Sequence, residues 1–191
     1  WSKSGEMLFA DYATRGFQNQ HVLSLDMKNQ QMETLIHEQS KTNIDNFFYT
    51  VIEEKGKILF ASERNGWRQL YLLDLKTKVV THLAEGEYYV NDVIYIDEKA
   101  GIVYFTASGK ETGSNPYQQY LYKVSIEKND LKLLTPEKFN HDISFSPDGK
   151  YFTDNYSTTQ QPTTTVLRDS NTGKILVELA IADITGLNAL N

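Results

Sequence analysis

The sequence predicts an all-β protein, a β-propeller fragment of about four blades in which each blade is a four-stranded antiparallel sheet. Three observations predict this fold. A glycine-centred pattern repeats along the chain, turn residues recur about every 8 to 12 positions, and the segments between them are rich in aromatic and β-branched residues. Phe, Trp and Tyr make up 12% of the chain, whereas 11 Gly and 4 Pro are too few for a low-complexity sequence.

Each repeat opens with a turn that ends in glycine and runs into an aromatic strand. Four segments share this pattern, at residues 3–9, 54–60, 99–105 and 147–152. Their glycines, Gly5, Gly56, Gly101 and Gly149, lie 51, 45 and 48 residues apart. A period of this size is typical of propeller blades, which contain four strands each.

The remaining strands of each repeat follow in a fixed order: a polar loop, a second strand, a short turn and a third strand. The second strands are at residues 23–26, 71–74, 122–125 and 166–169, and the third at 32–37, 79–83, 131–134 and 174–179. One more apolar strand precedes the last three glycines, at residues 47–52, 92–97 and 142–146. Trp1 stands where this strand of the first repeat would end, so we expect three complete blades and one that lacks its inner strand.

The partial propeller is expected to cover residues 1–185, with a linker at residues 181–191. The approximate blades are residues 1–40, 41–85, 86–136 and 137–180. Turn chemistry agrees with this division, because Pro147 presets φ and Gly149 and Gly173 accept positive φ in tight turns. The longer loops share one face, where binding sites usually lie. They are at residues 13–19, 63–67, 108–119 and 153–162.

The composition argues against several classes of function. Nineteen Lys and Arg against 25 Asp and Glu give a formal charge of -6, so there is no positive field for nucleic acid and we expect no such partner. No apolar stretch approaches the roughly 20 residues that a membrane-spanning helix needs, so we expect no membrane span. The chain has no Cys, and its four His lack metal-ligand spacing, so the sequence predicts no metal site and no cofactor.

Residues 59–71 read Leu-Phe-Ala-Ser-Glu-Arg-Asn-Gly-Trp-Arg-Gln-Leu-Tyr. This segment resembles the Phe-x-Ser-Glu-Arg-Asp-Gly-Trp-x-x-Leu-Tyr signature in the propeller of bacterial dipeptidyl peptidase IV relatives, in the prolyl oligopeptidase family of serine peptidases. Asn65 replaces the usual Asp. Residues 103–107, 120–124 and 144–151 add further matches, so the resemblance spans about residues 1–185.

The resemblance implies the C-terminal half of an eight-bladed propeller, with further blades before Trp1 and an α/β-hydrolase domain after Asn191. It implies a non-catalytic segment of a serine dipeptidyl peptidase that removes N-terminal X-Pro or X-Ala dipeptides, where the propeller gates substrate access and lines the pocket. The implied partners are the peptide substrate and the protein's own hydrolase domain, and the implied location is periplasmic or secreted. A stand-alone propeller that binds partners without peptidase activity stays open as the alternative.

Catalytic residues are not expected in this chain. The family reaction needs a Ser in a Gly-x-Ser-x-Gly elbow, then Asp and His, and this elbow does not occur in the sequence. Ser62, Asp74 and His82 run in the same order, but their spacing places them on neighbouring strands of one blade. The family reads the free amino terminus of its substrate with a pair of glutamates; the pair at residues 53–54 falls in a turn, so we expect the true pair upstream of Trp1.

Candidate binding residues form two groups. In the family, the segment that enters the second of these blades contributes to the outer substrate pocket, and Phe48 and Tyr49 match it by offset. Packing in the blade core is the other interpretation of these two aromatics. Arg64, Trp67 and Arg68 are a candidate aromatic and cationic surface for a peptide or glycan, unless Trp67 caps its hairpin and packs between blades.

A partial ring leaves the flanks of its terminal blades open, and open apolar flanks promote association. We therefore expect the chain to self-associate weakly, as a homodimer or a loose aggregate, through these blades. A strictly monomeric sedimentation profile at high concentration would contradict this expectation.

Overall fold

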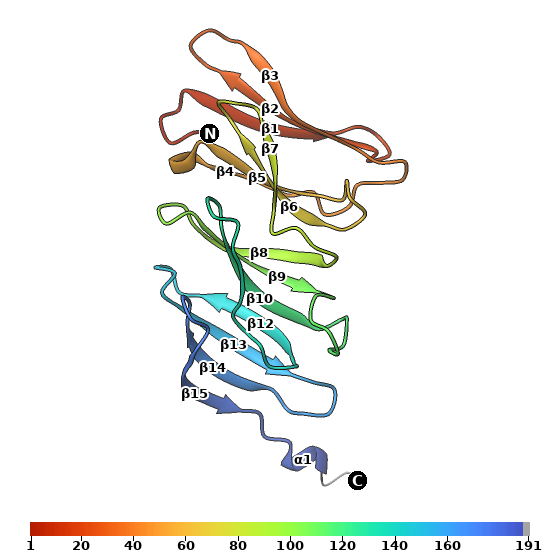
Figure 1. Cartoon of the computed structure of the whole chain (residues 1–191), viewed down its shortest axis with the longest axis vertical. Helices are drawn as coiled ribbons and strands as arrows, with labels where there is room; N and C mark the ends of the chain where they lie inside the picture. Colours follow the sequence, from red (N-terminus) through yellow and green to blue (C-terminus); the bar gives the residue numbers. More distant parts are fainter. Residues whose placement is uncertain (189–191) are drawn as a thin grey trace. The chain divides into compact units, whose positions relative to one another are not determined.

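A computed structural model describes residues 1–188 of the chain (Figure 1). These residues form fifteen strands, one 3-10 turn and a short helix. They divide into two compact units, Trp1–Glu85 and Gly86–Asn191, which we call unit 1 and unit 2. Each unit contains two antiparallel sheets whose strands are hydrogen-bonded in chain order.

Unit 1 holds a three-stranded and a four-stranded sheet (Figure 1). The first sheet consists of β1 (Met7–Ala13), β2 (Asn19–Asp26) and β3 (Met32–Gln39). The second consists of β4 (Tyr49–Ile52), β5 (Lys57–Ser62), β6 (Gln69–Asp74) and β7 (Val80–Leu83), with the 3-10 turn η1 (Glu53–Lys55) between β4 and β5. Gly56 closes this turn with a φ of 60°, the left-handed conformation that glycine adopts most readily.

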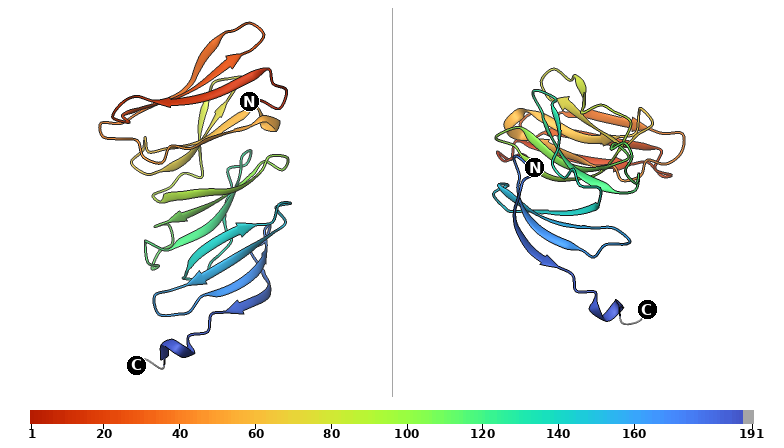
Figure 2. Two further views of the ribbon diagram at one scale, coloured as in Figure 1. Left: turned by 180° about the vertical axis from the view of Figure 1, so that it is seen from behind. Right: turned by 60° about the horizontal axis from the view of Figure 1, so that its bottom comes forward.

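Unit 2 holds two four-stranded sheets. The first consists of β8 (Tyr89–Asp97), β9 (Ile102–Ser108), β10 (Gln119–Ser125) and β11 (Leu131–Leu133). The second consists of β12 (Asn140–Phe145), β13 (Tyr151–Ser157), β14 (Thr164–Asp169) and β15 (Ile175–Ile181), and the helix α1 (Thr185–Asn188) follows. Figure 2 shows β15 at the edge of this sheet and α1 beyond it.

The predicted fold class is confirmed, because the chain is nearly all β and forms four antiparallel sheets of three or four strands. The first sheet has three strands, and each of the other three sheets has four. One expectation is wrong: residues 153–157 were predicted as loop but belong to β13. These residues are mostly polar, which suggested a loop, but they are hydrogen-bonded to β12 and β14. The pairing with two neighbouring strands outweighs the low strand propensity of the polar side chains. Residues 189–191 of the predicted linker lie outside the described residues.

A shared apolar core joins the two sheets of each unit. In unit 1, Val22 and Ile36 from the first sheet pack with Phe60, Tyr71 and Leu73 from the second, and all five are buried. In unit 2, Phe152 packs with Tyr104, Leu121 and Leu134 of the preceding sheet. Buried and part-buried residues alternate along β2, whereas nearly every residue of β5, β6 and β9 is buried, because these strands are covered on both faces.

Strands β2, β6 and β14 each end in an aspartate. Asp74, at the end of β6, shows the structural role of this residue. Its Oδ1 accepts hydrogen bonds from the backbone N–H groups of Lys76 and Thr77, at 3.0 and 2.8 Å. Its Oδ2 accepts a hydrogen bond from Lys57 Nζ at 2.8 Å. The bond from Lys57, followed by those from Thr77, holds the pKa of Asp74 well below its ordinary value of 3.8.

Asp74 is therefore expected to make unit 1 sensitive to acid. A carboxyl whose pKa is lower in the folded state stabilises the fold above its unfolded pKa, and this contribution is lost as the pH falls below about 4. Urea unfolding followed through Trp1 and Trp67, both of which lie in unit 1, should show a smaller loss of stability between pH 7 and pH 3 for Asp74→Asn than for the unaltered chain. Glu54→Gln, at an exposed position of η1, is the control, and equal losses in all three proteins would contradict the prediction.

Apolar side chains lie exposed along β15, the edge strand of the second sheet of unit 2. Its exposed apolar residues are Ile175, Leu176, Val177, Leu179 and Ile181, at 38 to 58% exposure. An exposed apolar edge strand is a place where chains associate. The expected self-association through a terminal blade stays a prediction, and β15 is the strand through which we expect it to occur.

Candidate functional site

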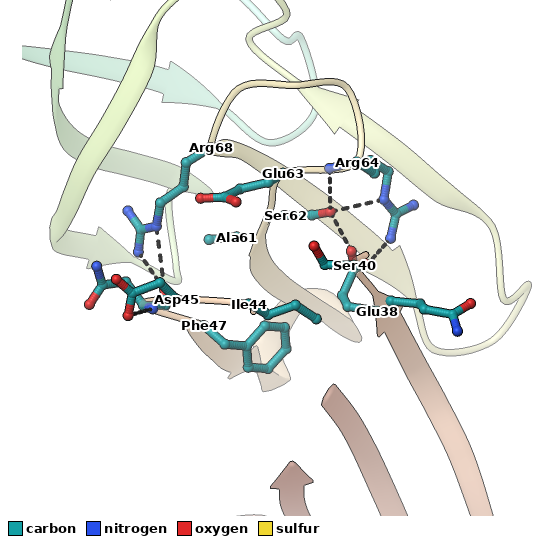
Figure 3. Close-up of a pocket in the computed structure, with 12 residues that line it drawn as sticks. Glu38, Ser40, Ile44, Asp45, Phe47, Ala61, Ser62, Glu63, Arg64 and Arg68 are labelled. Carbon is teal, nitrogen blue, oxygen red and sulfur yellow. Dashed lines mark hydrogen bonds and ion pairs between the residues drawn. The ribbon is translucent and has the colours of Figure 1, made fainter. Parts of the chain in front are cut away.

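A hollow of about 110 Å³ opens in unit 1 between two connections (Figure 3). One connection joins β3 to β4 and contributes Ile44, Asp45, Asn46 and Phe47. The other joins β5 to β6 and belongs to the segment at residues 59–71 that carries the sequence signature. Both connections lie at the same end of their sheets, as the predicted strand order requires.

The loop between β5 and β6 is held by short-range hydrogen bonds. Gly66 has a φ of 91° and donates its N–H to the Glu63 carbonyl at 2.9 Å. The Ser62 hydroxyl accepts the Arg64 N–H at 3.2 Å, and Asn65 Oδ1 accepts the Trp67 N–H at 3.3 Å. Side-chain turns of this kind fix the loop backbone, because Ser and Asn take the place of backbone acceptors.

One wall of the hollow is an ion pair between a buried carboxylate and an exposed guanidinium. Glu38, at 7% exposure, accepts a hydrogen bond from the Ser62 hydroxyl at 2.5 Å and forms an ion pair with Arg64. The Arg64 guanidinium also lies over the ring of Tyr71, 4.7 Å from its centroid. Burial is the largest cause of the raised pKa of Tyr71, so this ring stays neutral beneath the guanidinium.

The opposite wall is set by Arg68, which is 7% exposed. Its Nε and Nη2 donate hydrogen bonds to the Asn46 carbonyl at 3.3 and 3.1 Å. Asn46 has a φ of 50°, a left-handed conformation that Asn tolerates better than most residues. Arg68 thus ties the linker between β3 and β4 to the hairpin loop, so that the hollow is preformed.

The groups left open in the hollow are acidic and aromatic. Figure 3 shows the Glu63 carboxylate in the space between the two arginines and the Phe47 ring below it. Glu63 and Asp45 are both exposed, whereas the charge of Arg64 is paired with Glu38. The hollow therefore offers carboxylate acceptors beside an aromatic ring, which suits a small polar or cationic group.

Three residues in the order of a catalytic triad, Ser62, Asp74 and His82, have separate partners. Ser62 donates to Glu38, Asp74 pairs with Lys57, and His82 Nε2 lies 3.2 Å from Gln69 Oε1. Burial lowers the pKa of His82, which also stacks on the Tyr71 ring at 4.4 Å between centroids. Ser62 has a carboxylate rather than an imidazole as its acceptor, so these residues form no nucleophile and base pair.

The structure gathers some of the predicted site residues and separates others. Arg64 and Arg68 both line the hollow, whereas Trp67, at 41% exposure, does not. Phe48 and Tyr49 are half-buried and lie next to the lining residue Phe47, and Tyr49 packs against the apolar core of unit 1.

Three lining residues were not predicted as site residues from the sequence: Glu38, Asp45 and Glu63. Phe47 belongs to the same candidate segment as Phe48 and Tyr49. A signal for Glu38 exists, because it lies two residues after the buried Ile36 and so on the buried face of β3, where a charge needs a partner. Glu53 lies in η1, at the end of the sheet away from the hollow. Its carboxylate accepts the Lys3 N–H at 2.8 Å. Among residues 1–188, no group of three or more His, Asp or Glu is placed to hold a metal ion.

Comparison with known proteins identifies related sequences. The sequence model of the dipeptidyl peptidase IV (DPP IV) N-terminal region matches residues 1–163. Dipeptidyl peptidase 4 of Arthroderma otae is 30% identical over 96 residues, which are 48% of this chain and 12% of that protein. None of the helices in the described part of the chain has the length and apolar character needed to cross a membrane.

Two solved structures share the fold. The crystal structure of Porphyromonas gingivalis dipeptidyl peptidase 4 is 19% identical with a TM-score of 0.77, over 97% of this chain and 26% of that one. A putative dipeptidyl aminopeptidase IV from Bacteroides ovatus ATCC 8483 is 18% identical with a TM-score of 0.80, over 97% of this chain and 29% of that one. The chain thus spans less than a third of the length of each of these relatives.

Proposed function

The chain belongs to the dipeptidyl peptidase IV N-terminal region family, and from this membership we propose that it is a non-catalytic propeller segment of a serine dipeptidyl peptidase. In the whole protein it gates the access of peptides and lines part of the substrate pocket, while another domain removes X-Pro or X-Ala dipeptides. The observation that carries the proposal is the preformed hollow of unit 1, one side of which is built from the signature residues themselves.

The geometry of the hollow suits a wall rather than a reaction centre. Both arginines have structural roles: Arg68 donates to a backbone carbonyl, and Arg64 pairs with Glu38. Such fixed walls select substrates by shape and charge, and rigidity keeps the loss of conformational entropy on binding small. The acyl-transfer step needs an activated serine, for which Ser62 lacks a base.

Glu63, Asp45 and Phe47 are the side chains we propose to face the peptide, because they line the hollow and keep free surface there. Phe48 and Tyr49 extend the same aromatic segment and stay proposed pocket residues. A peptide amino terminus is a cation, and the two exposed carboxylates of the hollow would add to the attraction of the glutamate pair expected upstream of Trp1. We further propose that the whole protein is periplasmic or secreted, where extracellular peptides are available. Fractionation of cells that produce it should then recover the activity outside the cytoplasm.

The proposal is tested in the whole protein with the matched pair Glu63→Gln and Glu54→Gln. Both glutamates are exposed, but only Glu63 lines the hollow. With a peptide bearing an N-terminal Ala-Pro, we expect Glu63→Gln to raise KM about threefold with little change in kcat, because an exposed charge pair contributes up to about 1 kcal/mol. Glu54→Gln should leave both constants unchanged.

Two outcomes would overturn the proposal. Equal KM values for the two variants would mean that the hollow does not touch the substrate. Turnover of an Ala-Pro chromogenic substrate by the chain alone, blocked by a serine-directed inhibitor, would mean that the segment is itself catalytic.

A further inference from the structure

A second hollow, of about 350 Å³, lies within unit 2 and differs in chemistry from the first. It is bounded by the end of the loop between β9 and β10, by the start of β12 and by the end of β13 with the loop that follows. Asn115, Tyr117, Gln118, Asn140, Ser157, Thr158 and Thr159 line it. All seven carry a neutral polar group, and none is aliphatic or charged.

Tyr117 gives this hollow an open aromatic surface. Its side chain is 89% exposed, the largest exposure among the large hydrophobic side chains of the described residues. The backbone beneath it is fixed, because Asn115 Oδ1 accepts the Tyr117 N–H at 3.0 Å and the Asn115 carbonyl accepts the Gln118 N–H at 3.0 Å. An exposed aromatic ring on a fixed turn is ready to stack without first being ordered.

The Tyr117 turn is also tied to the neighbouring sheet. The Gln118 amide donates to the Lys138 carbonyl at 3.3 Å, and Asn140 Oδ1 accepts the Gln119 N–H at 3.2 Å. Asn140 thereby turns its amide nitrogen, a donor of two hydrogen bonds, away from this contact. The two sides of the hollow are therefore held at a set distance before any ligand arrives.

The third side supplies hydroxyl groups. Thr158 Oγ1 accepts the N–H groups of Gln160 and Gln161, both at 3.1 Å, and this shapes the loop after β13. Ser157 and Thr159 make no side-chain hydrogen bond within residues 1–188, so their hydroxyls are available as donors and acceptors.

We propose that this hollow binds a neutral saccharide. A sugar ring presents an apolar C–H face, which stacks on an aromatic ring such as Tyr117, and an edge of hydroxyls, each of which both donates and accepts. Amide and hydroxyl side chains match that edge, because they also do both. An anionic ligand would lack a cation among the lining residues, and a peptide side chain would lack an aliphatic pocket.

The test measures binding of maltohexaose, cellohexaose, mannohexaose and chitohexaose to the chain by saturation-transfer NMR and calorimetry. At least one should bind, with an affinity that changes less than about twofold between 50 and 500 mM NaCl, because neither partner carries charge. Tyr117→Ala and Thr159→Ala should each weaken binding, the first by about tenfold, and Tyr117→Phe should retain most of it because the ring is kept. Tyr151→Ala, at a 42% exposed tyrosine of the same unit outside the hollow, is the control and should bind normally.

Three results would overturn the proposal. The first is absence of binding by all four saccharides at 10 mM, and the second is binding that Tyr117→Ala leaves unchanged. The third is Tyr117-dependent binding of a neutral peptide such as acetyl-hexaglycine amide in place of any sugar, which would assign the hollow to a peptide. Because Tyr117 is almost fully exposed, none of these results depends on a variant that fails to fold.

Discussion

Replacing Asp154 with alanine is expected to lower the free energy of unfolding of unit 2 by about 3–5 kcal/mol, the range found when one partner of a buried ion pair is removed. Asp154 is fully buried on β13. Its Oδ2 accepts a hydrogen bond from Arg168 Nε at 2.9 Å, and its Oδ1 lies 2.9 Å from His141 Nδ1. Alanine would leave a guanidinium and an imidazole buried without the carboxylate between them.

The effect is large because Asp154 is the centre of a wider network. Arg168, at 1% exposure, also donates to the Glu137 carboxylate at 3.0 and 3.2 Å and to the Gly173 carbonyl at 3.0 Å. His141 Nε2 lies 3.0 Å from the Glu137 carbonyl. Three neighbouring strands, the segment before β12 and the turn before β15 are thus joined by side chains as well as by the sheet.

The measurement must report on unit 2 alone. Both tryptophans, Trp1 and Trp67, lie in unit 1, so tryptophan fluorescence follows the other unit. Hydrogen exchange of residues 140–169, measured by mass spectrometry at increasing urea, reports on unit 2 directly. Asp142→Ala, at an exposed aspartate of β12, should change stability by less than about 0.5 kcal/mol.

A loss of less than about 1 kcal/mol for Asp154→Ala would contradict a structural role for the network. The stability of Asp154→Asn should lie between that of the unaltered chain and that of Asp154→Ala, because the amide keeps an acceptor for Arg168 but removes the negative charge. If Asp154→Asn were as damaging as alanine, charge rather than hydrogen bonding would dominate.

Local signals account for the part of this architecture that could be predicted. Gly56, Gly101 and Gly149 each have a positive φ in a turn that precedes a strand, so their spacing reports directly on the repeat. Turn chemistry acts within four residues, and alternation acts within one strand. Both are visible in a single sequence, which is why the four sheets were predicted.

The candidate site was predicted only in part, because its two sides come from connections that are separate in sequence. Arg64 and Arg68 were predicted from their local motif. Phe47 lines the hollow because Arg68 binds the carbonyl of the adjacent Asn46, a contact that the sequence does not display. The network around Asp154 is hidden for a similar reason: cross-strand register pairs His141 with Tyr156 and Arg168 with Phe152, and so decides which side chains share a face. Register depends on the folded sheet and not on a spacing that the sequence displays.

Gly173→Ala is expected to destabilise unit 2 by about 3 kcal/mol, more than a positive φ alone explains. Gly173 has a φ of 79°, and a Cβ added there would lie 2.1 Å from the Leu134 carbonyl oxygen. Leu134 is buried and its N–H donates to the Leu121 carbonyl at 2.8 Å, so its backbone has little freedom to withdraw. The turn itself would have to move, and with it the Gly173 carbonyl that accepts from Arg168.

Gly109→Ala separates the contribution of backbone strain from that of the clash. Gly109 has a similar φ of 85° in the same unit, but an added Cβ would meet no atom within 4 Å. Its substitution should cost only the penalty of a left-handed residue, about 1 kcal/mol. Hydrogen exchange of residues 131–135 and 164–181 should accelerate in Gly173→Ala and stay near normal in Gly109→Ala. Equal effects would mean that the contact between Gly173 and Leu134 is looser than its geometry indicates, and that the turn before β15 does not hold the two sheets of unit 2 together.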